Sequence, residues 1–406
     1  MAQATSPRTR TVGRALLPLG LMFLAVGISM ALVVPFLALF LSTDVGAGPI
    51  RVTVFLFVGP LAGVIAAWAI GRLSDRRSMR RGLLITAALS GFVGSLLTAV
   101  VRDYWVLLGL AVTATAVAGA LFPQTFAYAR EVLQRDNPAR SAMGISGLRT
   151  VFSVAWVAGP PLAAVLLQAG GFRSVYGVAA GTYLVAAAVA AFWLKPLGPA
   201  TAPEPEDRAV PVIGAAPPAS RLTLLLAAVA FTLLQCPLTL GAQALPLYVS
   251  RDLNGDVGDA GLLLGLCAAL EIPLMLALGA LSTRIPLRPL ILGGAACGVA
   301  YYGLATLASE VWMLYALQPV NALFIAAVTG LGISFVQDLL PAEPGRATTL
   351  FTNTFPIGAM LAGPLFGLAQ NFGFRLAFAM ATGLCLAGMI VLAITPRLAL
   401  NRARTG

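Results

Sequence analysis

Two residues of opposite charge lie in apolar segments of this 406-residue chain and could together hold a polar ligand. Glu131 and Arg149 are 18 residues apart, and both fall within stretches that are otherwise apolar. A charge at mid-bilayer costs roughly 2.5–3.5 kcal/mol even on translocon-insertion scales, so such residues face a cavity or a partner. An ion pair between the two would offset part of this cost. The planar guanidinium fork also suits two adjacent hydroxyl groups.

Both residues also have a simpler interpretation. Glu131 directly follows Arg130 and could be a charge at the membrane surface. Arg149 could instead cap the end of a helix. We predict that Arg149 and Glu131 bind the ligand, and these alternatives stay open.

Glu271 is the only carboxylate deep within an apolar segment of the second half of the chain. It lies in LCAALEIPLML, and Pro273 opens the helix two residues later. Removal from water disfavours the charged form of a carboxylate, so a buried one can take up and release a proton as its access changes. It can also accept hydrogen bonds from hydroxyl groups. We predict that Glu271, and secondarily Glu131, couples transport to protons; the alternative is a carboxylate tied permanently to a polar partner.

Neutral amides and aromatic side chains also occur within the apolar segments. They are Gln124, Gln235, Gln243, Asn321 and Asn353, with Trp156, Tyr128 and Tyr248 as the aromatic residues. Amides can bind the edges of hydroxyl groups while an aromatic ring stacks on a C–H face. Each amide could equally join two helices by a hydrogen bond. We predict ligand contacts for Gln124, Trp156, Gln243, Asn321 and, above the other amides, Asn353.

Metal and cofactor chemistry find no support in the sequence. Histidine is absent, which excludes a histidine proton relay, His-ligated haem and typical zinc sites. The four cysteines have no metal-ligand spacing, and we expect them to pack as small apolar residues. They are Cys236, Cys267, Cys297 and Cys385. No clustered nucleophile and base is present either, so we predict neither an enzyme nor a cofactor.

The elements that position these residues are predicted to be membrane-spanning helices. Hydrophobic residues make up 59% of the chain and charged residues 10%, and the mean hydropathy is +0.91. A helical span needs about 20 apolar residues. Charged segments and Pro/Gly-rich segments separate these spans and divide the chain into two sets of six. They are 16–41, 51–71, 82–101, 104–129, 143–168 and 174–194, then 222–249, 260–283, 289–308, 311–336, 346–369 and 374–395.

The placement of basic residues supports this count independently. With the amino terminus inside, the inner segments hold 20 of the 26 Lys and Arg residues and the outer segments hold 5. This bias places both termini in the cytoplasm and predicts a multi-pass protein of the cell membrane. The net charge of +11 then reflects topology and contacts with anionic lipids, not nucleic-acid binding. We interpret the first apolar run as an uncleaved helix, since no cleavage pattern follows it.

The two sets of spans resemble each other in sequence. A proline-rich stretch, 195–221, separates a predicted domain 1–194 from a predicted domain 222–406 and favours an extended tether. GRLSDR at 71–76 matches GALSTR at 279–284, and RTVFSVAWVAGP at 149–160 aligns with NTFPIGAMLAGP at 353–364. Duplication of a six-helix unit explains both matches. Units with an even number of helices relate by an axis along the membrane normal, which predicts a cavity between them.

Several segments resemble a known transporter family. The architecture resembles the major facilitator superfamily. More narrowly, FPQTFAYARE, WVAGPPLA, AALEIP, QPVNALFIAAVTGLGISFVQDLLP and GRATTLFTNT resemble the bacterial sugar efflux transporter (SET) family. The resemblance implies proton-linked export of sugars or sugar-like glycosides. We expect a monomer that works by alternating access.

Two further motifs bear on mechanism. GRLSDRRSMRR at 71–81 resembles the loop of the superfamily between its second and third helices, and predicts a gating role for Gly71, Asp75, Arg76 and Arg77. The alternative is a basic loop that only sets topology. Gly159-Pro160-Pro161 resembles a fifth-helix motif of proton antiporters. Because Gly363-Pro364 repeats it in the second half, we interpret it as a kink and close-packing site.

We therefore expect an all-helical transporter that exchanges a sugar or glycoside for protons. A proton-coupled multidrug exporter is the main alternative, and such a protein would tolerate loss of Arg149 for neutral hydrophobic compounds. A receptor would be expected to carry a larger soluble segment than 195–221.

Overall fold

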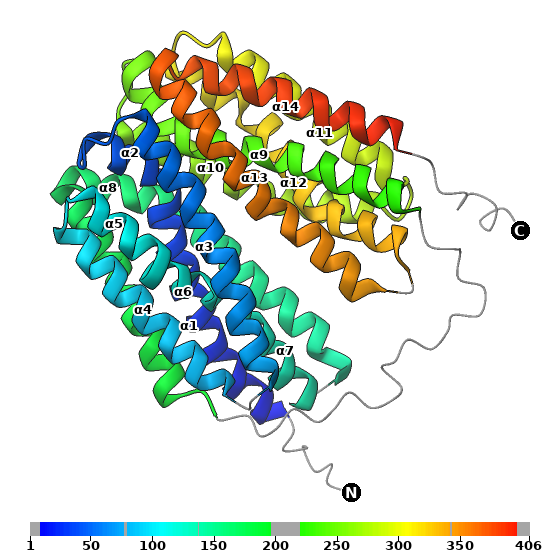
Figure 1. The fold of residues 1–406 in the computed structure, drawn as a ribbon. Coiled ribbons are helices and arrows are strands. Elements are labelled where there is room, and N and C mark those ends of the chain that lie inside the picture. Colours follow the sequence, from blue (N-terminus) through cyan, green and yellow to red (C-terminus); the bar gives the residue numbers. More distant parts are fainter. Residues whose placement is uncertain (1–8, 77–78, 137, 196–219, 342, 396–406) are drawn as a thin grey trace, which may run out of the picture. The chain divides into compact units, whose positions relative to one another are not determined.

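The computed structural model describes residues 9–76, 79–136, 138–195, 220–341 and 343–395, and their regular secondary structure is helical throughout (Figure 1). The helices of the first half are α1 (Thr9–Val33), η1 (Val34–Phe36), α2 (Leu37–Thr43), α3 (Pro49–Arg76), α4 (Arg80–Val100), α5 (Tyr104–Leu110), η2 (Ala111–Thr115), α6 (Ala116–Gly119), α7 (Leu121–Asp136) and α8 (Pro138–Phe192). Those of the second half are α9 (Arg221–Asp252), α10 (Val257–Leu281), α11 (Leu287–Thr306), α12 (Val311–Leu339), α13 (Pro344–Phe372) and α14 (Arg375–Ile394).

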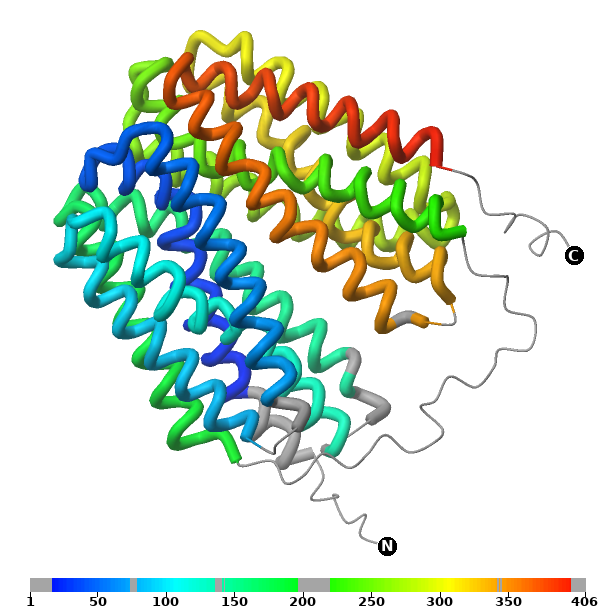
Figure 2. Tube along the Cα trace, viewed as in Figure 1, coloured from blue at the N-terminus to red at the C-terminus, as the bar shows by residue number. Residues whose placement is uncertain are grey.

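Each of the twelve predicted spans corresponds to a helical stretch of the described residues. Ten helical stretches there are long and apolar enough to cross a membrane. One of them contains two predicted spans, because α8 breaks at Gly170–Gly171 and the Cα trace turns back there (Figure 2). Gly171 has φ +64°, a conformation that favours glycine. The 29-residue α13 is the remaining long helix, and its first turns carry the polar residues of GRATTLFTNT.

The fourth predicted span is not a uniform helix. Between α5 and α6 the backbone forms a π-helix, η2, and the chain tightens again at Ala120, whose N–H bonds the carbonyl of Val117 at 3.1 Å. The hydroxyl of Ser90 on α4 donates to the carbonyl of Ala114 at 3.0 Å. Irregular backbone at membrane depth occurs only where protein or a cavity adjoins it. The irregular part of the span therefore ends just before Gln124.

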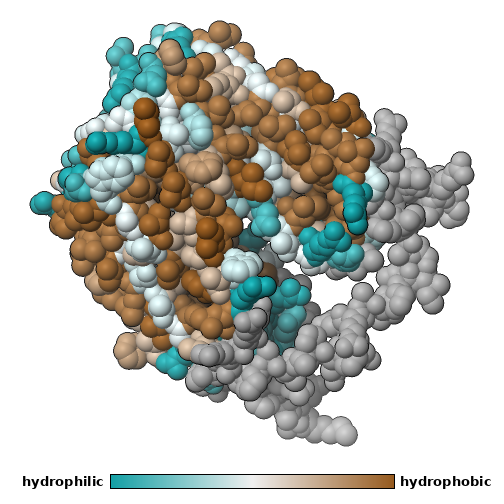
Figure 3. Space-filling model, in the orientation of Figure 1, coloured by the Kyte–Doolittle hydropathy of each residue, from teal (hydrophilic) through white to brown (hydrophobic). Residues whose placement is uncertain are grey.

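The surface has the composition that a membrane requires. Hydrophobic residues dominate the lengths of the helices on the visible face, whereas hydrophilic residues gather toward helix ends (Figure 3). Large apolar side chains such as Trp105, Phe192, Leu276 and Phe372 are exposed. Exposure of this kind suits contact with lipid tails.

The chain divides into two compact units, of residues 1–46 and 58–200 and of residues 47–57 and 201–406. The predicted domains 1–194 and 222–406 differ from this division at 47–57, where Thr53 lies against Gly363 and Gly367 of α13. Most of the predicted linker, 196–219, lies outside the described residues. The domain boundaries therefore stay predictions.

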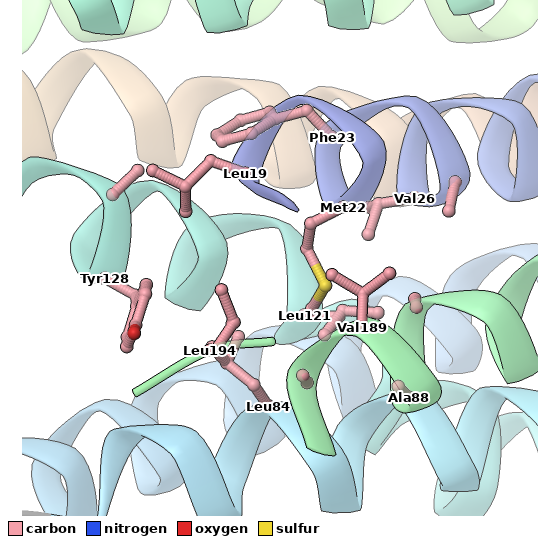
Figure 4. Close-up of a cluster of buried hydrophobic side chains, with 14 of the residues drawn as sticks. Leu19, Met22, Phe23, Val26, Leu84, Ala88, Leu121, Tyr128, Val189 and Leu194 are labelled. Atoms are coloured by element: carbon pink, nitrogen blue, oxygen red, sulfur yellow. The ribbon is translucent and has the colours of Figure 1, made fainter. Parts of the chain in front are cut away.

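The core of the first unit joins α1, α4, α7 and the end of α8. Leu19, Met22 and Val26 of α1 lie among side chains of the other three helices, including Leu84 and Val189 (Figure 4). Tight contacts between small residues complete the packing of α1 against α8. A Cβ on Gly27 would lie 2.6 Å from the Cβ of Ala155, and one on Gly159 would meet Ala31. The predicted close-packing role of Gly159 is thus confirmed for the first half.

An arginine at the start of the third span caps the end of the sixth in both units. Arg81 donates to the carbonyls of Ala190 and Ala191 at the end of α8. Arg288 donates to those of Leu392 and Ala393, at 3.1 and 2.5 Å, at the end of α14. Guanidinium groups here satisfy carbonyls that have no partner within their helix and favour the negative end of the helix dipole. The same arginine cap in both units is consistent with a duplicated six-helix unit.

Candidate functional site

Glu131 is held by arginines at one end of the first unit. Its Oε2 pairs with Arg80 Nη1 and its Oε1 with Arg135 Nη2, each at 2.5 Å. Arg80 also donates to the carbonyl of Ala127 at 3.4 Å, so the cluster ties the start of α4 to α7. Both carboxylate oxygens therefore pair with arginines other than Arg149, and the expected ion pair with Arg149 is wrong for this structure. Ligand and proton roles of Glu131 stay predictions.

Arg149 lies on the face of α8 that also carries Phe152, Ser153 and Trp156, because these positions follow it by three, four and seven residues. Its side chain is exposed within the described residues, and that of Trp156 is half-buried. The carbonyl of Arg149 accepts a hydrogen bond from Ser153 at 3.2 Å. An exposed guanidinium can present its fork to a polar ligand.

An aromatic cluster lies one turn from Arg149 and was not predicted from the sequence. Phe152 of α8 stacks on Phe122 of α7 with ring centroids 4.4 Å apart. Phe126 contacts Phe122 at 5.0 Å and Phe23 of α1 at 4.5 Å. The spacing of FPQTF and VFSVAW places these rings on facing sides of two helices, which is the signal that could have identified them. Phe23 is buried in the core of the unit, and the half-buried rings of Phe122, Phe126 and Phe152 pack against that core beside Arg149.

Gln124 lies in the first turn of α7, directly after the irregular part of the fourth span. Its side chain is 7% exposed, and its Oε1 is buried without a hydrogen-bond partner among the described residues. A buried acceptor without a partner is rare in folded proteins and calls for an explanation. A hydroxyl group of a ligand would satisfy it.

A second polar group lies within the second unit, between α10 and α12. Asn321 Nδ2 donates to Cys267 Sγ at 3.3 Å and to Gln318 Oε1 at 3.4 Å. Its Oδ1 is buried and has no partner among the described residues. Cys267 is buried, as an apolar packing residue would be, and it also accepts a hydrogen bond. Gln318 was not predicted as part of any site.

Glu271 follows Cys267 by one helical turn on α10. It is half-buried and lies on the same face of the helix as Cys267. The predicted carboxylate and the predicted amide Asn321 thus adjoin the same cysteine, within one unit. The structure brings these two candidates into one neighbourhood, and their roles stay predictions.

The other predicted amides occupy different environments. Gln243 is buried in α9, whereas Asn353 is exposed on α13. Thr354, the neighbour of Asn353, accepts a hydrogen bond from Gln235 Nε2 at 2.6 Å. Gln235 therefore joins α9 to α13, as its alternative interpretation states. An exposed amide on a membrane helix remains a candidate for ligand contact.

Two predicted aromatic residues bond the backbone of neighbouring segments. The hydroxyl of Tyr128 donates to the carbonyl of Lys195 at 2.8 Å, and that of Tyr248 to the carbonyl of Ala305 at 2.8 Å. Both side chains are buried, so neither ring offers a free face to a ligand. These two residues stabilise helix packing, and their expected stacking role is wrong.

The gating motif is only partly described. Gly71 lies within α3, and no heavy atom lies within 4 Å of a Cβ built on it. The side chains of Asp75 and Arg76, and the whole of Arg77, lie outside the described residues. The described residues contain no group of three or more His, Cys, Asp or Glu side chains that could hold a metal ion.

Comparison with known proteins identifies relatives along most of the chain. The family profile of the Major Facilitator Superfamily matches residues 19–243 and 230–405. Sugar efflux transporter A of Escherichia coli (strain K12) is 36% identical over 349 residues, covering 86% of this chain and 87% of the relative. Sugar efflux transporter A of Dickeya chrysanthemi is 35% identical over 362 residues, covering 88% and 90%. The crystal structure of the nucleoside transporter NupG has a TM-score of 0.77 at 11% identity, with 94% of this chain and 98% of that chain covered.

Proposed function

Because this chain belongs to the Major Facilitator Superfamily, we propose that it is a secondary transporter that exports sugars or glycosides in exchange for protons. It acts by alternating access, as a monomer in the cell membrane, with both termini in the cytoplasm. It has no catalytic role. Glu271 carries the exchanged proton, and Arg149 orients the substrate.

The relatives support the substrate class. Two proteins that are 35% and 36% identical to this chain over most of their length are called sugar efflux transporters. The likeness to NupG, at 11% identity, supports the fold alone.

The observation that best supports a hydroxylated substrate is that buried amide oxygens lack a hydrogen-bond donor among the described residues. Of the three buried side-chain acceptors without a partner among the described residues, two belong to the predicted ligand-binding amides Gln124 and Asn321. The third belongs to Gln370. Leaving such an acceptor unmatched costs about 1–3 kcal/mol. A sugar carries many O–H donors and few apolar surfaces, so it suits acceptors of this kind.

Transport by purified protein in vesicles tests this proposal. Radiolabelled glucose, lactose and methyl glucoside should each be compared with common apolar cationic drugs in counterflow. We expect saturable counterflow of at least one sugar or glycoside. Counterflow of the drugs alone would contradict the proposal.

Arg149 provides the matched test of the site. Arg149→Lys keeps the charge but loses the fork, and hydrogen bonds to charged groups contribute about 1.5–3 kcal/mol each. The apparent affinity for the sugar should therefore fall about tenfold or more. An unchanged affinity in Arg149→Lys and Arg149→Ala would contradict a substrate contact.

A multidrug exporter is the second candidate, and the half-buried aromatic rings of Phe122, Phe126 and Phe152 favour it. Such a surface would hold an apolar compound without any hydrogen bond. A drug exporter should retain transport of neutral hydrophobic compounds in Arg149→Ala, whereas a sugar carrier should lose sugar transport.

A further inference from the structure

Three polar side chains of the second unit contact one another, and two of them fix the orientation of the Asn321 amide. Cys267 lies on α10, and Gln318 and Asn321 lie one turn apart on α12. We propose that Cys267 and Gln318 are positioning residues, which orient Asn321 so that its Oδ1 accepts a hydrogen bond from a hydroxyl group of the transported sugar. This inference rests on the proposed function.

Both hydrogens of the Asn321 amide have an acceptor within the protein. Nδ2 lies 3.3 Å from Cys267 Sγ and 3.4 Å from Gln318 Oε1. An amide group is planar, so its oxygen points away from the two atoms that its nitrogen contacts. Cys267 and Gln318 thus select one of the two orientations that the amide could adopt.

The two supporting side chains are themselves fixed. Gln318 is 1% exposed, and its Nε2 donates to the carbonyl of Leu314 at 3.1 Å, one turn back on α12. This bond directs the Gln318 oxygen toward Asn321. Cys267 is 5% exposed, on a helix that packs along α12. A binding group is most precise when rigid elements and buried neighbours hold it.

The Asn321 oxygen is left without a donor by this arrangement. It is buried, and no described residue donates to it. A planar amide held by its nitrogen cannot turn to find another partner without breaking both existing contacts. A neutral O–H group satisfies the oxygen, whereas an anion would be repelled by it. Glu271, one turn from Cys267, is a further acceptor nearby, so this part of the unit suits a substrate with several hydroxyl groups.

Two other O–H groups lie near this cluster. The hydroxyl of Tyr301 is engaged by Gln318. Glu271 in its protonated form also carries an O–H group and lies one helical turn from the same cysteine. If this group were the donor, Asn321 would serve proton coupling instead of substrate binding. A double variant at Asn321 and Glu271 distinguishes a donor on the sugar from a donor on Glu271.

Counterflow of radiolabelled glucose in vesicles tests the proposal, because it needs no proton gradient. Cys267→Ala removes the acceptor that holds the amide nitrogen, and Cys267→Ser retains one. Cys385→Ala is the matched control, since Cys385 is a buried cysteine of the same unit. We expect KM to rise about tenfold in Asn321→Leu and several-fold in Cys267→Ala, with the maximal rate close to that of the wild type. Cys267→Ser and Cys385→Ala should stay within about twofold of the wild type.

Monodeoxy analogues of glucose identify the partner directly. One analogue should lack the hydroxyl group that Asn321 binds. The wild-type protein should bind this analogue more weakly than glucose, whereas Asn321→Leu should bind the two equally, because the hydrogen bond is already absent in the variant. Equal losses in both proteins for every analogue would overturn the proposal. So would identical behaviour of Cys267→Ala and Cys385→Ala, or a KM effect of Asn321→Leu that disappears in a Glu271→Leu background, which has no donor at position 271. If wild-type protein transports none of the sugars, the proposed function itself fails; if it transports them and the variants behave alike, only this inference fails.

Discussion

Replacing Arg80 with methionine should destabilise the first unit, because it removes one of the two guanidinium groups that hold Glu131. The side chains of Arg80 and Glu131 are 22% and 15% exposed, so solvent screens their ion pair only in part. A hydrogen bond to a charged group contributes about 1.5–3 kcal/mol, whereas an exposed ion pair contributes about 0–1 kcal/mol. Arg135 still neutralises the carboxylate in the variant. We therefore expect the free energy of unfolding to fall by about 1–2 kcal/mol.

Thermal melting of the purified protein in detergent measures this change. For a unit of this size, about 1–2 kcal/mol corresponds to a fall in Tm of about 2–8 °C. The matched control is Arg346→Met, since Arg346 pairs with Glu343 at 3.0 Å with side chains 65% and 51% exposed. This control should leave Tm nearly unchanged. Equal shifts in the two variants would refute the argument that partial burial gives the Glu131 cluster its stabilising role.

Two further substitutions test the packing. Gly27→Leu should disrupt the first unit, because a Cβ at this position lies 2.6 Å from the Cβ of Ala155. Gly20→Leu should be tolerated, because the space around its Cβ is open. Size-exclusion chromatography distinguishes the two variants, and equal profiles would be evidence against close α1–α8 contact. Tyr302→Phe removes the buried hydrogen bond to the carbonyl of Pro237 at 2.8 Å and should lower stability by about 0.5–1.5 kcal/mol. A melting curve identical to that of the wild type would show that this bond does not contribute.

The helices were largely predictable from the sequence, since apolar runs of about 20 residues and basic inner loops identify membrane spans. The break at Gly170–Gly171 also falls in the predicted gap between 168 and 174. The π-helix at Ala111–Thr115 was not predicted, because AVTAT has the composition of an ordinary apolar helix. Its geometry depends on tertiary contacts such as that of Ser90 with Ala114.

The candidate site was predictable only in part, for reasons that differ between residues. Arg135 follows Glu131 by four residues, a spacing that places both on one helix face and makes their ion pair predictable from the sequence. Arg80, in contrast, meets Glu131 across 51 residues of chain, which no local pattern indicates. The bond from Asn321 to Cys267 likewise depends on how α10 packs along α12. Residue type identified the amide, and packing determined its partners.

Sugar-driven proton movement tests the central claim most directly. Vesicles containing purified protein and a trapped pH dye receive glucose, lactose or methyl glucoside on one side. The account predicts that a transported sugar drives protons in the opposite direction, and that Glu271→Gln abolishes this pH change while sugar counterflow persists. Sugar transport by the wild-type protein without any pH change, or an unchanged pH response in Glu271→Gln, would contradict it.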